Sequence, residues 1–281
     1  MSAPKLAYDL SQKLKWPHTL EEWQVMDEIS PIIAIASDKG FCATALLTQY
    51  SWGDVLGMVL VDPEVQRLGL GTAVTKQAIS LSQTRQNNCI VLTASHDAEV
   101  LYQKLGFEKL GSVFILKGKG AGVAAPSQIT CSASNISKEF YQDCPTREKI
   151  LERVISASPN NYYKKANDGG VEAFASSIRR ISPDGQESIA LGPILLRQPD
   201  GIVPLLEHFF KTSNVEITCF VFSGFKNEDN NTKRVRSKIM TEFNSQGFSI
   251  VDELQFMNKG EMLPSLYSDS RIVSPISLAF G

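Results

Sequence analysis

Apolar and polar positions in the first half of the chain follow two alternating patterns. Some stretches repeat apolar residues with the helical period of 3.6, and others are short apolar runs typical of strands. The predicted helices cover residues 20–29, a segment from about residue 69, and residues 98–105; the predicted strands cover 32–36, 41–49, 56–62, 89–94 and 107–116. Gly106 ends the third helix, because glycine is favoured just after a helix C-terminus. This order predicts a mixed α/β (α+β) fold.

The second half is set apart by residues 118–137, which are small, polar and rich in Gly, Ala and Ser. After this segment, residues 146–157 place four apolar side chains on one face of a predicted amphipathic helix. A chain of 281 residues has room for two domains of roughly 100–150 residues each. We therefore expect two domains, at residues 1–122 and 138–281.

Two short patterns of the first half recur in the second. Leu56-Gly57-Met58-Val59-Leu60 is echoed by Leu191-Gly192-Pro193-Ile194-Leu195, and Gly106-Phe107 by Gly247-Phe248, at offsets of 135 and 141 residues. Two similar offsets in the same order suggest a diverged duplication. The alternative is chance recurrence, because such short pairs are common.

Composition and charge narrow the function classes. Hydrophobic residues make up 43% and charged residues 21% of the chain, a balance typical of globular proteins. No run approaches the ~20 apolar residues of a membrane span, and the N-terminus lacks a signal-peptide pattern, so we expect a cytoplasmic protein without a membrane partner. With a formal charge of −2, the chain lacks the excess of basic residues that is typical of nucleic-acid-binding proteins, so we expect no nucleic-acid partner. The five cysteines form no C-x-x-C pair, so we expect neither a metal site nor a disulfide framework.

The segment from residue 57 to residue 74 runs from an apolar strand through a Gly69-x-Gly71 turn into a helix. Free N–H groups in the first turn of a helix, the positive end of its dipole and glycines that permit close approach make an anion site, and a diphosphate fits it. Val74 stands where the dinucleotide fingerprint needs a third glycine, and no Lys-Ser or Lys-Thr pair follows Gly71, so neither a dinucleotide site nor a nucleotide-hydrolase loop is favoured. The alternative is a simple strand-to-helix turn.

Two motifs in this half carry a resemblance to a known family. Gln66-x-x-Gly69-x-Gly71 resembles the pyrophosphate loop of GNAT acyltransferases, and Ala98-x-x-Leu101-Tyr102-x-Lys104-Leu105-Gly106-Phe107 is similar to the second signature of that family. The resemblance implies a mixed central sheet flanked by helices and acetyl-CoA or coenzyme A as cofactor. It implies cofactor contacts from Met58, Val59, Leu60, Val61, Gln66, Arg67, Leu68, Gly69, Leu70, Gly71, Thr72, Ser95 and Tyr102.

Within this resemblance, single residues have implied roles. The strand before the loop splays from its neighbour, and its backbone from Met58 to Val61 hydrogen-bonds the pantetheine arm. Tyr102 is the implied general acid for the departing thiolate, with a half-buried core aromatic as the alternative. Ser95 stands where many members carry an asparagine that contacts the cofactor, so that contact is in doubt and Ser95 is a candidate cap of the following helix.

The remaining similarity is to tandem GNAT proteins with a degenerate second domain. It lies in residues 16–23, in Gly192-Pro193 and in the final residues 278–281. The implied function is transfer of an acetyl group to the amine of a small molecule or protein by direct attack. The alternative is a non-catalytic acyl-CoA-binding module, and oligomerisation stays open.

The acceptor amine has weaker candidates. Trp16, His18, Glu22 and Trp23 are expected to border it, with the two tryptophans as a wall, and His18, Glu21, Glu22 and His96 are possible bases. Plain packing explains an aromatic pair at a helix entry equally well. A proton path through water would leave no trace in the sequence.

Overall fold

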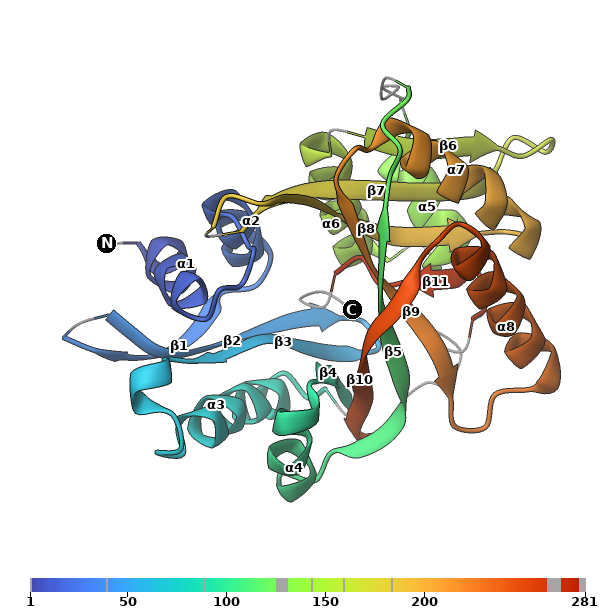
Figure 1. Ribbon diagram of the computed structural model, residues 1–281. Helices are drawn as coiled ribbons and strands as arrows, with labels where there is room; N and C mark the ends of the chain where they lie inside the picture. The colour runs from blue at the N-terminus through green and yellow to red at the C-terminus, as the bar shows by residue number, and fades with distance from the viewer. Residues whose placement is uncertain are drawn as a thin grey trace.

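The first half of the chain contains every element that the pattern predicts. We describe a computed structural model that covers residues 2–38, 40–87, 89–124, 131–142, 144–158, 160–182, 184–261 and 269–277 (Figure 1). The elements of the first half are α1 (Ala3–Lys13), α2 (Leu20–Ile29), β1 (Ile32–Ser37), β2 (Gly40–Tyr50), β3 (Gly53–Val61), the 3₁₀ turn η1 (Pro63–Val65), α3 (Leu70–Thr84), β4 (Cys89–Ala94), α4 (His96–Lys104) and β5 (Glu108–Lys119). The predicted bounds of 20–29 and 89–94 are confirmed without change.

The second half repeats this order. Its elements are α5 (Ala133–Phe140), α6 (Pro145–Ala157), β6 (Asn160–Lys165), β7 (Val171–Ile181), β8 (Glu187–Leu196), η2 (Pro199–Gly201), α7 (Ile202–Thr212), β9 (Glu216–Phe225), α8 (Asn230–Ser245), β10 (Ser249–Gly260) and the added strand β11 (Ile272–Ser274). In the segment 118–137, residues 125–130 lie outside the described residues, and β5 and α5 flank them.

The two patterns that recur along the sequence occupy matching places. Leu56 forms the last parallel pair between β3 and β4, and Leu191 forms the last parallel pair between β8 and β9. Gly106 and Gly247 both have positive φ, +85° and +81°, just after a helix. The observed fold therefore supports the predicted repeat.

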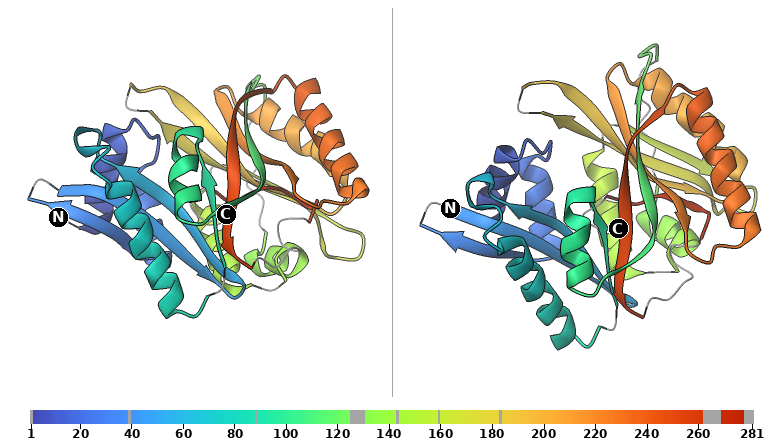
Figure 2. Two further views of the ribbon diagram at one scale, coloured as in Figure 1. Left: turned by 90° about the horizontal axis from the view of Figure 1, so that it is seen from below. Right: turned by 60° about the horizontal axis from the view of Figure 1, so that its bottom comes forward.

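All the strands belong to one mixed sheet that joins the two halves. Its order is β1-β2-β3-β4-β10-β5-β9-β8-β7-β6, with β11 paired to β8. The last long strand, β10, lies between β4 and β5, while β5 pairs on its other side with β9 (Figures 1 and 2). Each half thus completes its sheet with a strand from the other half.

Helices cover both faces of the sheet. In Figure 1, α1 and α2 lie above β1–β3, and α3 and α4 lie below. Consecutive residues of β2 accordingly point to opposite faces of the sheet. Leu46 packs in the core that includes α1, α2, α5 and α6, and Leu47 packs in the core formed with α3 and α4. A third core lies between the second half of the sheet, α7 and α8. Among the described residues no helix is long and apolar enough to cross a membrane.

Candidate functional site

The turn between β3 and α3 has the geometry of an anion site. Arg67 and Gly69 have positive φ, +63° and +81°, and Gly69 occupies the N-cap of α3. The first intrahelical bond runs from Ala73 N–H to Gly69 O, so the N–H groups of residues 70–72 precede the helical ladder. A Cβ on Gly69 would meet no atom within 4 Å, so a ligand can approach the backbone there. These features fit a pyrophosphate at the N-terminus of α3.

The turn is connected to the helix that carries Tyr102. A Cβ on Gly71 would lie 3.2 Å from Leu101 Cδ1 and 3.5 Å from Val61 Cγ2. Gly71 therefore lets α3 begin close to both α4 and the end of β3. Gln66 bridges the turn, because its Nε2 donates to Val61 O at 3.4 Å. Leu68 and Arg67 are exposed.

Beside this turn, β3 and β4 diverge as expected. Their parallel ladder runs from Asp54 to Leu56 on β3 and stops there, although β3 continues to Val61. On its other side, β3 has a bulge in which Met58 and Val59 lie opposite one residue of β2, and Met58 has a φ of +51°. The buried Thr44 hydroxyl donates to Met58 O at 3.1 Å and holds the bulge in place. The β4-facing edge of β3 from Met58 to Val61 thus forms no ladder with β4.

Tyr102 lies on α4, on the face of the sheet that α3 covers. Its residue surface is 6% exposed, and its ring packs in the core with Leu92 and Ala94 of β4. The Tyr102 and Phe107 rings meet edge to face at 5.7 Å between centroids. Burial raises the pKa of the Tyr102 phenol, so the hydroxyl keeps its proton at neutral pH. That state suits a proton donor and excludes a resting phenolate.

Ser95 occupies the N-cap position of α4, but its side chain makes no capping hydrogen bond. The predicted capping role is therefore wrong for the side chain. Ser95 and His96 are exposed. Glu21 is also exposed, on the first turn of α2.

The residues proposed to border the acceptor separate into two groups. Trp23 is 0% exposed and its Nε1 donates to Ser11 Oγ at 3.2 Å, so it belongs to the core between α1 and α2 and forms no wall with Trp16. Trp16 is 37% exposed, and its ring centroid lies 5.6 Å from that of His18. Glu22 closes a capping box: its carboxylate accepts from Thr19 N–H at 2.8 Å while Glu22 N–H donates to Thr19 Oγ1.

An arginine from the second half joins this group. Arg180, near the end of β7, donates from Nη2 to Glu22 Oε1 at 3.1 Å. The sequence reasoning missed Arg180. A signal was available in the adjacent pair Arg179-Arg180, because neighbours on a strand point to opposite faces and one of the two must turn inward.

His18 is a poor general base in this setting. Burial, and next the charge of Arg180, lower its pKa to about 4, while Glu22 opposes the shift. The imidazole is therefore neutral near pH 7 but binds a proton weakly. Its Nδ1 is buried and has no hydrogen-bond partner among the described residues.

His18→Gln is expected to make the protein less sensitive to acid. The folded state protonates His18 near pH 4 and the unfolded state near 6.5, so stability is full above 6.5 and falls as the pH drops towards 4. The loss approaches roughly 1.4 kcal/mol per pH unit. Denaturant unfolding at several pH values should show the variant gaining on the wild type as the pH falls. A pH-independent difference would contradict the prediction, and exposed His96→Gln is the control.

The place in the second half that corresponds to the gap between β3 and β4 is filled by the chain itself. Parallel pairing of β8 with β9 ends at Leu191, and beyond it β11 pairs with β8 at Ile194 and Leu195. A Cβ on Gly192 would lie 2.9 Å from Pro275 O and 3.0 Å from Ser274 Oγ. All three residues of β11 are buried. The second gap therefore contains a strand, and the first does not in the part of the chain that the structure describes.

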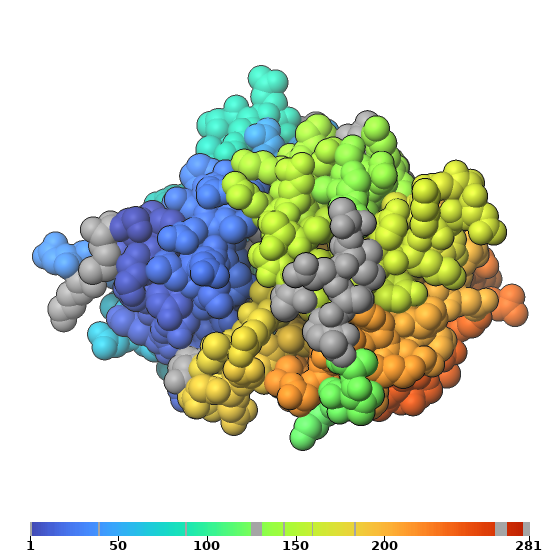
Figure 3. Space-filling view, turned by 90° about the horizontal axis from the view of Figure 1, so that it is seen from above, coloured from blue at the N-terminus to red at the C-terminus, as the bar shows by residue number. Residues whose placement is uncertain are grey.

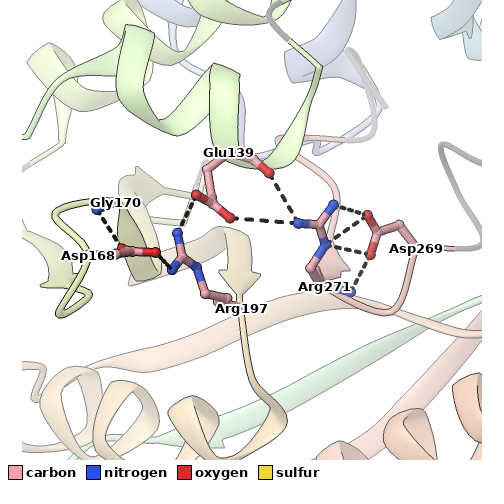
Figure 4. A network of polar contacts seen from close by, with 6 residues as sticks. All are labelled: Glu139, Asp168, Gly170, Arg197, Asp269 and Arg271. Carbon is pink, nitrogen blue, oxygen red and sulfur yellow. Dashed lines mark hydrogen bonds and ion pairs between the residues drawn. The ribbon is translucent and has the colours of Figure 1, made fainter.

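An ion network fixes β11 in that gap (Figure 4). Arg197, just after β8, donates to Glu139 of α5 and to Asp168 of the β6–β7 turn, each at 2.6 Å. Arg271, just before β11, pairs with Asp269 at 2.7 Å and with Glu139 at 3.7 Å. Glu139 thus lies between two guanidinium groups, and β11 is tied to the helix and turn beside it.

The hydroxyl group of Tyr102 also has no counterpart at the matching position of the second half. Phe243 holds the place of Tyr102: Phe107 N–H donates to Tyr102 O and Phe248 N–H to Phe243 O, each at 3.0 Å. The Phe243 and Phe248 rings meet edge to face at 5.2 Å, as those of Tyr102 and Phe107 do. The second half therefore repeats the aromatic packing without the hydroxyl group.

Comparison with known proteins agrees with this geometry. Residues 17–119 match the family described as "Acetyltransferase (GNAT) domain", and they include both the Gly69-x-Gly71 turn and Tyr102. Over this range the chain is similar to GNAT acetyltransferase domains. GNAT domains use acetyl-CoA, which accords with the anion site at α3.

Individual relatives extend the comparison. The "Uncharacterized N-acetyltransferase YitH" of Bacillus subtilis (strain 168) is 26% identical over 156 residues, which cover 52% of this chain and 52% of that protein. The chain thus spans about half the length of this curated relative. A putative acetyltransferase from Pyrococcus horikoshii superposes with a TM-score of 0.70 at 16% identity, covering 100% of this chain and 94% of the other. A GCN5-related N-acetyltransferase from Sphaerobacter thermophilus gives 0.56 at 14%, covering 92% and 94%. The fold of both GNAT-like halves is therefore shared with acetyltransferases.

Proposed function

We propose that this chain is an N-acetyltransferase that holds acetyl-CoA in the gap between β3 and β4 and transfers the acetyl group to an amine. The observation that carries the proposal is that the diverging edge of β3 leads into the anion turn, whose Gly71 lies against Val61 of β3 and against Leu101, the residue before Tyr102. The edge, the turn and Tyr102 each fit one part of the cofactor, namely the pantetheine arm, the pyrophosphate and the thioester sulfur. When bound, acetyl-CoA would supply an acetyl group activated as a thioester.

The residues of the chain have distinct roles in this proposal. Backbone groups from Met58 to Val61 would hold the arm and offer N–H donors to the carbonyl oxygen. The turn residues Gln66, Arg67, Leu68, Gly69, Leu70, Gly71 and Thr72 would hold the pyrophosphate. Tyr102 Oη would carry the proton that the sulfur needs, since a protonated thiol departs more readily than a thiolate at neutral pH.

The first experiment asks whether the chain turns over its cofactor. Purified protein with acetyl-CoA and a panel of small amines and peptides should release free CoA thiol with at least one acceptor, and mass spectrometry should find the acetylated amine. The rival is a non-catalytic acyl-CoA-binding module. Tight CoA binding without acetyl transfer to any amine or protein would favour that rival.

We infer further that the halves, residues 1–122 and 138–281, act as a catalytic and a degenerate GNAT-like domain. Four observations support this. Phe243 replaces Tyr102, and β11 occupies the second gap. Pro199 contributes no N–H to the η2 turn, and Asp200 places negative charge there. The final residues 278–281, part of the tandem resemblance, lie outside the described residues.

One CoA per chain is the expected binding stoichiometry. The first gap has an anion turn and an unpaired strand edge, whereas β11 covers the edge of β8 that a second pantetheine arm would need. Isothermal titration calorimetry with CoA should give a value near one. Two sites of similar affinity would show that β11 leaves its place or that the second turn binds pyrophosphate after all.

A further inference from the structure

The contact between the two halves of the chain includes a small polar site at the start of α2. The tip of the β7–β8 hairpin reaches α2 in Figure 1, and in Figure 3 its yellow surface adjoins the blue surface of the first two helices. Arg180 comes from this hairpin, while His18 and Glu22 come from the N-terminal side of α2. Arg180 Nη2 donates to Glu22 Oε1 at 3.1 Å, and burial together with the charge of Arg180 lowers the pKa of His18.

Two atoms of this site have open hydrogen-bonding capacity. Arg180 is 8% exposed, and its Nη2 is used by Glu22, yet its Nε has no partner among the described residues. His18 Nδ1 is buried and equally without one in the same part of the chain. Arg180 bonds the Glu22 carboxylate, and His18 directly precedes Thr19, whose N–H bonds the same carboxylate. Buried polar atoms are nearly always hydrogen-bonded, so two such atoms around one carboxylate call for a ligand group or ordered water.

The second half has a matching contact, between the start of α6 and the end of β2, and its residues pack differently. Arg147 occupies the third position of α6, as Glu22 does in α2, and it lies at the end of β2. Its guanidinium stacks on the rings of Tyr50 at 4.5 Å and Tyr141 at 5.0 Å. At α6 the arginine thus packs between aromatic rings, whereas at α2 the arginine pairs with the carboxylate of Glu22.

The segment that carries His18 is tied to the end of β3, where the proposed acyl-CoA gap opens. Lys13, at the end of α1, pairs at 2.6 Å with Asp62, the residue that follows β3 and starts the turn to α3. From there the chain continues to His18, whose carbonyl accepts from Gln12 Nε2 at 3.2 Å. The α1–α2 connection therefore begins at the end of β3 where the gap opens and ends at Arg180.

We propose that Arg180 is a specificity-determining residue, and that Arg180 Nε and His18 Nδ1 together bind an uncharged oxygen, an amide carbonyl or a hydroxyl, of the amine acceptor. This inference rests on the proposed function and names its substrate class. Glu22 already neutralises the Arg180 cation and His18 is uncharged, so a carboxylate would bring an unpaired negative charge into a buried site. A neutral oxygen accepts the same hydrogen bonds, one from Arg180 Nε–H and one from Nδ1–H of the neutral His18 imidazole in that tautomer, without that cost.

The test compares three amines that differ in one group: leucinamide has a neutral oxygen, leucine a carboxylate, and isoamylamine neither. Binding of each to the protein saturated with CoA is measured by calorimetry, and kcat and KM are measured wherever turnover occurs. The wild type should prefer leucinamide over both others by about tenfold or more, the scale of one or two buried hydrogen bonds. Equal binding of the three, or no binding of leucinamide, would overturn the proposal.

Arg180→Lys separates recognition from structure, because lysine keeps the charge that Glu22 needs and lacks the Nε–H. This variant should lose the preference for leucinamide through KM, with kcat and the binding of isoamylamine unchanged. The matched control is Arg179→Lys, whose neighbouring guanidinium pairs with Glu187 on the surface. A uniform loss for all three amines, or a fall in melting temperature that accounts for it, would show that Arg180 only joins the halves. Failure of all amines to be acetylated would count against the proposed function, while the binding preference still decides this inference.

Discussion

Tyr102→Phe is expected to lower the turnover number by about 10²-fold or more while leaving the affinity for acetyl-CoA unchanged. The ring packs against Phe107 and the core beneath α3, so phenylalanine preserves the packing and removes the hydroxyl alone. The second half already demonstrates this replacement, because Phe243 makes the same edge-to-face contact with Phe248. The fold therefore accommodates the substitution, and a loss of rate would report on proton donation.

Two measurements make this test decisive. Calorimetry with acetyl-CoA checks that the dissociation constant is retained, and the rate of thiol release gives the turnover number. Tyr162→Phe is the control, since Tyr162 lies on β6 in the second half. Because burial raises the pKa of Tyr102, the wild type should keep its rate on the alkaline side up to the ordinary phenol value of 10.0 without a loss due to this residue. An unchanged turnover number in Tyr102→Phe would remove the hydroxyl from the mechanism.

The parts of the site that the sequence predicts are those specified by local chemistry. Gly69 precedes α3 and Gly106 follows α4, and both adopt a positive φ that glycine permits. The apolar run of β3 comes shortly before the turn. The divergence of β3 from β4 follows from the family resemblance, and it is confirmed by a ladder that stops at Leu56. The position of Tyr102 depends on α4 and the residues packed around it, but the motif that contains it is contiguous in the sequence and can therefore be recognised there.

The remaining features depend on partners that are distant along the chain. Nothing local in residues 249–260, the first five of which are exposed, identifies β4 and β5 as the neighbours of β10. Proximity in the sequence suggests that Trp16 and Trp23 form one wall beside the acceptor, but the helical geometry of α2 directs Trp23 into the core. Arg180 meets Glu22 across the junction of the halves; the pair Arg179-Arg180 indicates that one arginine turns inward, but no local pattern identifies its partner.

These distant contacts explain what the second half contributes. It provides β10, without which β4 would be an edge strand in the described sheet, and it provides Arg180 beside His18. Its own gap is filled by β11 and held by the network around Glu139. A repeat whose own gap contains a strand can thus support the neighbouring half, and the proposed acceptor specificity would come from both halves.

Gly71→Glu is expected to abolish cofactor binding. The residue lies in the first turn of α3, where free N–H groups and the helix dipole favour an anion, and a carboxylate there would occupy the pyrophosphate position and repel it. Any side chain at this position also meets Leu101, since a Cβ would come within 3.2 Å of its Cδ1. Gly71→Gln has the same bulk without the charge and is therefore the matched control. Calorimetric titration should find no CoA binding to the Glu variant and weakened, measurable binding to the Gln variant, and raising the salt concentration should narrow the difference between them. If the Glu variant kept micromolar affinity for CoA, the pyrophosphate would have to bind elsewhere and the assignment of the turn would be wrong.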